Sequence, residues 1–297
     1  MRKIILLLAI AVSALTAQSQ LLWRVSGNGL QKPSYLFGTH HYAPLTVLDS
    51  VPEVRRVLAD AAQVCGEIDM LNLNAATRAT AQAMMLPQGK SLNDFIAADR
   101  RAEVDTMLKA YIGIGLDNPV VQRLCPAAVA NQLTAAIVQK QLPSAPLDQR
   151  LDVYFQTKAS KAGKKVLALE TVQDQLKLLF GSPLTRQGRL LVCLAENADW
   201  TVGMLEMMTD AYMRRDLAAI KELTEQKLGD DCDTTPDEEA AMLSDRNYAW
   251  MERLPAMFAE AQTLVVVGVG HFVGDDGLLN LLKKAGYTVE PVDKLTK

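Results

Sequence analysis

Two short apolar runs joined by a Gly-rich polar connection open the regularly patterned part of the chain. Leu21 to Val25 and Ser34 to Gly38 flank the sequence Ser-Gly-Asn-Gly, which predicts a β-hairpin. Apolar residues then recur at helical spacing from Val51 to Ala62, where we expect a helix. Gln63 to Asp69 has the pattern of a short strand that ends in two carboxylates. The N-terminal part therefore predicts a compact strand–helix–strand unit.

In the middle of the chain, apolar residues recur mostly at the spacing of a helix. Ala-, Met- and Leu-rich segments from Asn74 to about Leu142 are interrupted by prolines, which predicts a series of helices. A helix at Leu147 to Lys161 leads into the apolar strand Lys165 to Glu170, which again ends on a carboxylate. From Thr171 to about Leu228 the helical pattern returns, with interruptions.

The C-terminal part again alternates between helices and strands. Gly229 to Glu239 is acidic and turn-like, so we expect an exposed loop, and Glu238 to Ala261 is expected to be helical. Thr263 to Gly268 is a strongly apolar strand. A helix at Gly277 to Ala285 and a strand at Thr288 to Val292 complete the pattern.

Strands that alternate with helices at both ends of the chain predict an α/β fold around one sheet with parallel or mixed central strands. The residues in between, about 74–145 and 171–228, are expected to form a large helical insertion that serves as a lid or second lobe. We expect one domain over residues 20–297.

The first residues differ from the rest of the chain. Met-Arg-Lys precedes an apolar run from Ile4 to Leu15, and the small residues Ala17 and Ser19 follow at the spacing that signal peptidase prefers. Because this run is too short to span a bilayer comfortably, we expect residues 1–19 to be a cleaved signal peptide, with a retained anchor as the alternative. The protein is then exported, to a periplasm or out of the cell, and its mature part has no integral membrane segment.

Charge and cysteine content narrow the functional classes. The net charge of −3 becomes −5 once Arg2 and Lys3 are removed with the signal peptide, so nucleic acid is not an expected partner. The four cysteines are Cys65, Cys125, Cys193 and Cys232. They lack CxxC spacing, and we expect buried, unpaired thiols. A single bridge among the last three is the alternative, because export permits disulfides.

Histidine is scarce, and all three histidines lie in two Gly-x-x-His segments. His40 and His41 close the segment that begins at Gly38, and His271 closes the one that begins at Gly268. Each segment ends an apolar strand, where α/β folds place their ligand sites, and the glycines let the backbone bend there. Successive strand residues point to opposite faces, so we expect His41 to face the site and His40 to pack or support it.

Carboxylates end the other two apolar strands. Glu67, with Asp69 nearby, and Glu170 would meet His41 and His271 at one sheet edge if their strands are neighbours. Two imidazoles and a carboxylate suit a catalytic divalent metal, which would lower the pKa of bound water and polarise a carbonyl group. Without a metal, the same groups could act as general base and acid. For Glu170, pairing with a basic residue or capping the helix after it is the alternative.

Arg246 and Asn247 stand early in a predicted helix. Such a pair in a pocket could orient a carboxylate or stabilise an oxyanion. The alternative is an exposed helix face, with Arg246 paired to a nearby acid, namely Glu238, Glu239 or Asp245.

Several short segments occur in an order that is specific to one family. The first are Leu22-Trp-Arg-Val, Ser34-Tyr-Leu-Phe-Gly-Thr-His-His and Val64-Cys-Gly-Glu-Ile-Asp. Next come Leu147-Asp with Asp152, Lys165-Val-Leu-Ala-Leu-Glu-Thr with Gln173, and Arg246-Asn with Trp250. The last are Gly268-Val-Gly-His with Gly274, Gly277-Leu-Leu and Gly286-Tyr-Thr-Val. This ordered set resembles the TraB/GumN family, which includes the Tiki-type metalloproteases, and covers nearly the whole mature chain.

The resemblance implies an active site built from two Gly-x-x-His motifs and a glutamate. The motif positions fall on Gly38, His41, Glu67, Gly268 and His271. Further signature positions fall on Glu170, Arg246 and Asn247. The family is also similar to erythromycin esterase and ChaN-like proteins, which implies a mixed central sheet flanked by helices. His40 replaces the usual apolar residue, which leaves open which imidazole faces the site.

The leading hypothesis is an exported metal-dependent hydrolase of the peptidase type, acting on a peptide or small molecule. His41 and His271 would bind a divalent Mn, Co or Zn ion, with Glu67 as third ligand or base. Arg246 and Asn247 would hold the substrate or the oxyanion. One alternative is a protein that binds a peptide or haem without turnover, and the other is a metal-free esterase-like hydrolase that uses His and Glu as acid and base. The oligomeric state stays open.

Overall fold

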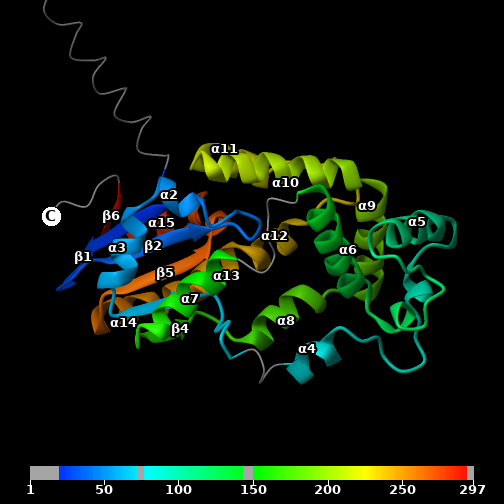
Figure 1. Cartoon of the computed structure of the whole chain (residues 1–297), viewed down its shortest axis with the longest axis horizontal. Helices are drawn as coiled ribbons and strands as arrows, with labels where there is room; N and C mark the ends of the chain where they lie inside the picture. The colour runs from blue at the N-terminus through cyan, green and yellow to red at the C-terminus, as the bar shows by residue number, and fades with distance from the viewer. Residues whose placement is uncertain (1–19, 73–76, 143–149, 293–297) are drawn as a thin grey trace, which may run out of the picture.

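The computed structural model describes residues 20–72, 77–142 and 150–292, and the strands in these ranges form one sheet in the order β4-β3-β5-β2-β1-β6 (Figure 1). The strands are β1 (Leu22–Gly27), β2 (Ser34–Thr39), β3 (Gln63–Gly66), β4 (Lys165–Ala168), β5 (Thr263–Gly268) and β6 (Tyr287–Pro291). Neighbours among β4, β3, β5 and β2 are parallel, whereas β1 is antiparallel to both β2 and β6. The predicted α/β fold with a mixed central sheet is confirmed.

The Gly-rich connection forms the predicted hairpin turn between β1 and β2. Gly27, Asn28 and Gly29 have φ angles of 77°, 48° and 79°, in the left-handed region that glycine and asparagine tolerate best. The register that follows places Leu22 opposite Phe37 and leaves every residue of β2 buried.

Helices cover both faces of the sheet. The helices α3 (Glu53–Asp60) and α7 (Leu151–Lys161) lie on one face, and α14 (Leu254–Glu260) and α15 (Leu278–Lys284) on the other (Figure 1). The rings of Phe37 and Phe155 of α7 have centroids 5.1 Å apart, while Cys65 Sγ lies 3.8 Å from Met257 Sδ of α14. Burial on both faces explains why the central strands are continuously apolar.

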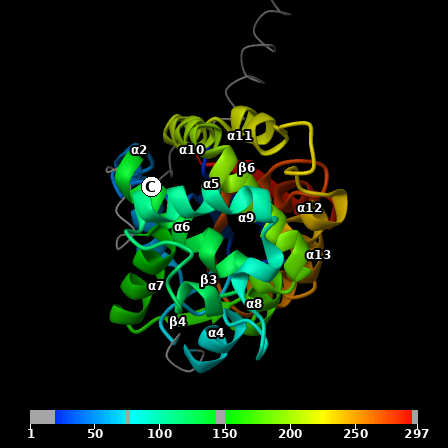
Figure 2. The same cartoon turned by 90° about the vertical axis from the view of Figure 1, so that its right-hand side faces the viewer.

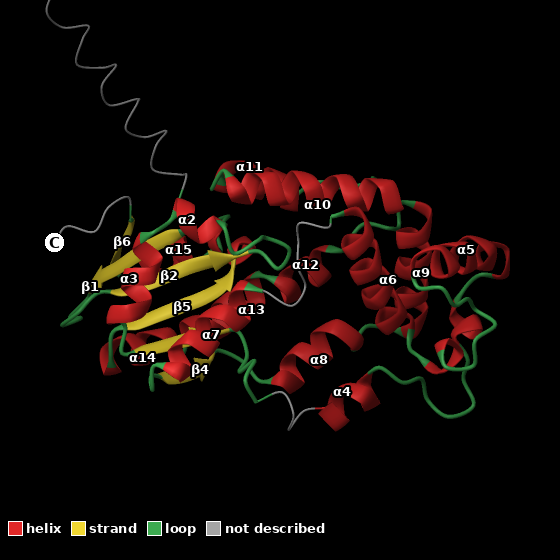
Figure 3. Ribbon diagram, in the orientation of Figure 1, coloured by secondary structure: helices red, strands yellow, loops and turns green. Residues whose placement is uncertain are grey.

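Most of the helices in the middle of the chain form a second lobe beside the sheet (Figures 2 and 3). They are α4 (Thr77–Ala83), α5 (Arg101–Tyr111), α6 (Pro126–Gln141), α8 (Val172–Phe180), α9 (Leu184–Glu196) and α10 (Ala198–Met213), with the 3₁₀ turns η2 (Leu92–Phe95), η3 (Ala98–Arg100) and η4 (Val121–Arg123). Helix α11 (Leu217–Thr224) instead belongs to the sheet side, because its Leu217 and Ile220 are part of the sheet's core. The second lobe has its own apolar core, which includes Leu92, Val104, Leu133 and Leu191. The predicted helical insertion is therefore a second lobe.

Two helical predictions need correction. The helix expected from Val51 begins at Glu53 and follows a separate short helix, α2 (Val47–Ser50). The helical stretch expected from Glu238 is divided into α12 (Pro236–Met242), α13 (Ser244–Met251) and α14. The chain breaks at Leu243, with φ −127° and ψ −72°, and again before Pro255, which lies in the first turn of α14 and cannot continue a preceding helix.

Two of the four cysteines form a disulfide, and the other two are free. Cys193 of α9 and Cys232 form a disulfide, whereas Cys65 and Cys125 are free and buried. The expectation of unpaired thiols is correct for Cys65 and Cys125 and wrong for the other two.

The expected signal peptide, residues 1–19, lies outside the described residues, as do residues 74–76 and 147–149 of two expected helical segments. Within the described ranges, no helix combines the length and apolar character needed to cross a membrane.

Candidate functional site

The candidate site lies where the four parallel strands end, at the sheet edge that faces the helical lobe (Figure 3). His40 and His41 follow β2, Glu67 follows β3, Glu170 lies two positions after the end of β4, and His271 lies in the 3₁₀ turn η5 (Val269–Phe272) after β5. The register pairs Thr39 with Gly268, so the two Gly-x-x-His motifs end adjacent parallel strands. Strands that run in the same direction bring these ends to a common edge.

Gly38 permits η5 to pack against the end of β2. A Cβ atom at this position would lie 3.0 Å from both Phe272 Cε2 and Val269 Cγ2, which is too close for an undisturbed fit. The Gly38 carbonyl accepts a hydrogen bond from the hydroxyl of the buried Tyr212 at 2.7 Å. The first motif glycine thus allows the close approach of the turn that carries His271.

Arg246 of α13 joins the carboxylates at the centre of this edge. Its Nε and Nη2 donate to the two oxygens of Glu170 at 3.0 and 2.7 Å, and Nη2 also donates to Glu67 Oε2 at 2.5 Å. Nη1 lies 2.9 Å from His271 Nε2. The guanidinium carbon lies 4.7 Å above the ring of Trp250. Arg246 therefore faces the sheet edge, and its expected alternative pairing with an acid of its own helical segment is wrong.

Glu170 pairs with Arg246 and does not cap the helix that follows it. It accepts from both ends of the Arg246 fork and also from Trp250 Nε1 at 3.2 Å. The cap of α8 is Thr171, whose hydroxyl accepts from the Asp174 backbone N–H. Of the two alternatives for Glu170, pairing with a basic residue is the one found.

Glu67 is held as a carboxylate by donors on several sides. Its Oε1 accepts from the Gly268 backbone N–H at 2.8 Å, and its Oε2 accepts from Gln175 of α8 at 3.2 Å as well as from Arg246. Burial alone would raise the pKa of Glu67, but His271, Arg246 and the Gly268 amide together lower it. Glu67 is thus a charged, rigidly oriented group.

His271 has a fixed tautomer because of Asn247. The amide nitrogen of Asn247 donates to the backbone carbonyls of His271 and Asp276 at 3.3 and 2.8 Å. Its oxygen is therefore the atom that lies 2.7 Å from His271 Nδ1 and accepts the proton there. His271 Nε2 then carries a lone pair, and burial lowers the pKa of this imidazole to about 4. At neutral pH His271 is a neutral base or ligand.

His41 is oriented by a carboxylate in a similar way. Its Nδ1 lies 3.1 Å from Asp152 Oδ2, and Asp152 Oδ1 accepts from the Thr39 hydroxyl at 2.8 Å. The hydrogen bond to Asp152 and the negative charges of Asp152 and Glu67 raise the pKa of His41 above its usual value. The side chain is 58% exposed, and Nε2 has no partner among the described residues. His41 therefore offers one free nitrogen to an incoming group.

His40 and Asp69 lie apart from the Arg246 cluster. His40 Nε2 is 3.0 Å from the hydroxyl of Thr209 on α10, and burial lowers the pKa of this histidine to about 4. Asp69 accepts hydrogen bonds from Leu71 and Asn72 within its own turn. His40 thus packs toward the helical lobe, and Asp69 stabilises the turn after β3.

The donor atoms can be tested for their fit to a metal ion. His271 Nε2 and Glu67 Oε1 lie 4.0 Å apart, a separation that one ion with bonds of about 2.0–2.2 Å to each atom can bridge. In the described ranges, three or more ligand atoms lie within 4.8 Å of one another only at Asp230, Asp231 and Cys232, and that sulfur is used in the disulfide. The ligand atoms of His41, His271 and Glu67 therefore do not all lie within 4.8 Å of one another. The donor types fit a divalent ion, with His271 and Glu67 as a half-site and His41 as the group that must approach.

Three residues at the site have roles that sequence reasoning did not assign. Asp152 orients His41, Gln175 binds Glu67, and Trp250 stacks on Arg246. Asp152 and Trp250 stand in the signature segments, yet an acid in the first turn of a helix is too common to mark a site by itself. No pattern in the sequence marks Gln175.

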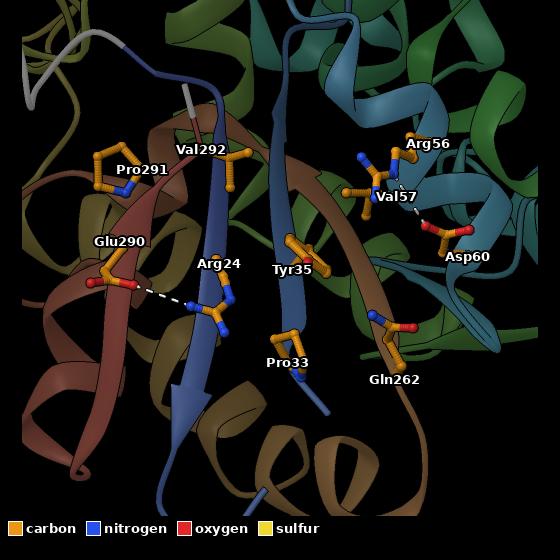
Figure 4. Close-up of a pocket in the computed structure, with 10 residues that line it drawn as sticks. All are labelled: Arg24, Pro33, Tyr35, Arg56, Val57, Asp60, Gln262, Glu290, Pro291 and Val292. Atoms are coloured by element: carbon orange, nitrogen blue, oxygen red, sulfur yellow. Dashed lines mark hydrogen bonds and ion pairs between the residues drawn. The ribbon is translucent and has the colours of Figure 1, made fainter. Parts of the chain in front are cut away.

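A hollow of about 410 Å³ lies at the opposite edge of the sheet, near the amino ends of β2 and β5 (Figure 4). Its charged side chains form the pairs Arg24–Glu290 at 3.4 Å and Arg56–Asp60 at 3.7 Å. None of the predicted site residues lines it. The hollow is therefore separate from the candidate site.

Comparison with known proteins points to one family. The sequence model of the TraB/PrgY/gumN family matches residues 21–291. A protein named Metalloprotease TIKI homolog from Amphimedon queenslandica is 23% identical over 92% of this chain and 61% of its own length. Metalloprotease TIKI2 of Xenopus tropicalis is 26% identical over 91% of this chain and 59% of its own, and that of Danio rerio is 24% identical over 91% and 60%. This chain thus spans about three fifths of the length of these relatives. No solved structure gives a significant match.

Proposed function

Because the chain belongs to the TraB/PrgY/gumN family, we propose that it is an exported metal-dependent hydrolase of the peptidase type. The observation that carries the proposal is the placement of His271, whose neutral Nε2 lies 4.0 Å from the Glu67 carboxylate at the edge where His41 also ends its strand. The relatives are named as metalloproteases, and these names support a hydrolase of the same class.

His41, His271 and Glu67 would hold a divalent ion, Mn, Co or Zn, with Glu67 as third ligand or as the base toward water. Such an ion would polarise a peptide carbonyl and lower the pKa of bound water. Asp152 and Asn247 each accept a hydrogen bond from the Nδ1–H of one histidine, which leaves Nε2 as the ligand atom. Both polar atoms of Asn247 are engaged by the protein, so we assign it to orienting His271 rather than to binding substrate.

The proposal includes export to a periplasm or the cell exterior, with residues 1–19 as the signal peptide and residues 20–297 as one domain. The Cys193–Cys232 disulfide supports export, because disulfides persist mainly in oxidising compartments. The substrate we propose is a peptide.

One observation favours a second candidate, a metal-free esterase-like hydrolase. Asp152 and His41 form an oriented acid–imidazole pair with a raised pKa, an exposed ring and a free Nε2. Such a pair can remove a proton from water or a nucleophile without a metal. Activity that survives exhaustive chelation would favour this candidate.

The test is metal content after chelation and reloading with manganese, cobalt or zinc. Wild type should retain close to one equivalent after gel filtration, and His41→Ala and His271→Ala should lose it. His40→Gln is the matched control, because His40 contacts Thr209 instead of the cluster, and it should retain the metal. Wild type that takes up no metal under any loading condition would contradict the proposal.

A further inference from the structure

One guanidinium contacts all three groups at the centre of the site. Arg246 Nη2 lies 2.5 Å from Glu67 Oε2 and 2.7 Å from Glu170 Oε1, while Nη1 lies 2.9 Å from His271 Nε2. The side chains of Arg246, Glu67 and Glu170 are only 13%, 17% and 10% exposed. The position between Glu67 and His271 is therefore filled by a positive charge that belongs to the chain.

The contact with His271 uses the lone pair that a metal would need. His271 Nδ1 donates its hydrogen bond to Asn247, so Nε2 can only accept, and its partner is Arg246 Nη1. Glu67 likewise directs one oxygen to the same guanidinium. Because His271 Nε2 has a single lone pair, a metal ion bound to it and the present contact with Arg246 exclude each other.

We infer that Arg246 competes with the divalent ion for Glu67 and His271, so that guanidinium and metal occupy this position in turn. This inference rests on the proposed function and adds to it a residue that controls metal entry.

The charges of the cluster are consistent with such an exchange. Two carboxylates, one guanidinium and a neutral imidazole carry a net charge of −1, whereas a divalent ion in place of the guanidinium makes the group neutral. Buried carboxylates without any cation are strongly disfavoured, so one of the two cations is always needed. The exchange does not require the site to pass through an uncompensated state.

Trp250 provides a direct report on the position of Arg246. The guanidinium carbon stacks 4.7 Å from the ring centroid, and Trp250 Nε1 donates to Glu170 Oε2 at 3.2 Å. Departure of Arg246 removes the stacked charge and leaves Glu170 beside the indole. The magnetic environment of this ring therefore changes when metal enters, whether or not a substrate is turned over.

The first test compares metal affinity in the mature protein by calorimetric titration with manganese, cobalt or zinc chloride. Arg246→Met removes the competitor, and if the open arrangement is populated at about 1–10%, its affinity rises by about 10-fold to 100-fold. Arg246→Lys, with a point charge in place of the fork, should show a smaller gain. Arg186→Met is the matched control, because it removes a two-point pair with Glu238 at similar burial and should leave the affinity unchanged.

The second test uses wild-type sequence and does not depend on the folding of any Arg246 variant. The chain has three tryptophans, so 5-fluorotryptophan labelling gives three ¹⁹F signals, and Trp250→Phe assigns the one of interest. The Trp250 signal should shift on metal addition while the signals of Trp23 and Trp200 stay in place.

The outcomes separate the inference from the proposed function. If wild type binds metal but Arg246→Met binds it no more tightly and the Trp250 signal stays still, the competition does not exist and the proposed function stands. If neither protein binds metal under any condition, the proposed function fails and the inference fails with it.

Discussion

Asn247→Leu tests how the protein fixes the tautomer of His271. The substitution keeps the approximate size of the side chain and removes its three hydrogen bonds. These are the acceptor contact to His271 Nδ1 at 2.7 Å and the donor contacts to the carbonyls of Asp276 and His271 at 2.8 and 3.3 Å. Asn247 is 2% exposed and His271 is 3% exposed, so water cannot readily replace the lost partner.

The expected loss of stability follows from these contacts. A typical hydrogen bond contributes about 0.5–1.5 kcal/mol, and a buried polar group left without a partner costs about 1–3 kcal/mol. Two short bonds and one long bond therefore give a decrease of about 3 kcal/mol in the free energy of unfolding. Metal affinity should fall by about 10-fold to 100-fold, because the imidazole is no longer held in one tautomer and orientation.

Urea unfolding monitored by circular dichroism measures the first effect. Asn280→Leu is the matched control, because Asn280 makes a single side-chain bond, 2.8 Å to the Gly274 carbonyl, and should cost about 1 kcal/mol. If Asn247→Leu costs no more than Asn280→Leu, the assignment of Asn247 as the residue that orients His271 is refuted.

Three further predictions concern the titration of two histidines and the disulfide. The pKa of His41 is raised in the folded protein, so its pairing with Asp152 stabilises the fold at low pH and is lost as pH rises through that pKa. In an NMR titration Asp152→Asn should bring this pKa back toward about 6.5, and an unchanged value would exclude the pairing. His271, with its pKa lowered from 6.5 to about 4, acts in the opposite sense, and its burial should cost about 3 kcal/mol of stability as pH falls across that interval. Cys193→Ser opens a disulfide between residues 39 positions apart and should cost about 4 kcal/mol in urea unfolding, whereas an unchanged midpoint would rule out the Cys193–Cys232 bond.

The sheet could be predicted from sequence because each strand carries a local signal. The turn at Gly27 to Gly29 requires left-handed backbone, and the strand at Thr263 to Gly268 is apolar on both faces. The division of the last helical stretch could be predicted only in part. Pro255 marks the start of α14, but Leu243 breaks the chain between α12 and α13 with no proline or glycine to announce it.

The candidate site was predictable at the level of strand ends and not at the level of contacts. The positions of His41, Glu67 and His271 after apolar strands follow from the pattern of the chain. The fork of Arg246 joins Glu67, 179 residues away, and the orienting contact of Asp152 spans 111 residues. Such pairings depend on how α7 and α13 pack against the sheet edge, which no local pattern records.

The most direct test of the proposed function is cleavage of a peptide library by the purified, metal-reloaded protein, read by mass spectrometry. We predict sequence-dependent cleavage that disappears on chelation, returns on reloading and is absent in His271→Ala, while His40→Gln keeps it. An intact library under every loading condition, or cleavage that is indifferent to chelation and to the loss of His271, would contradict the account of a metal-dependent peptidase.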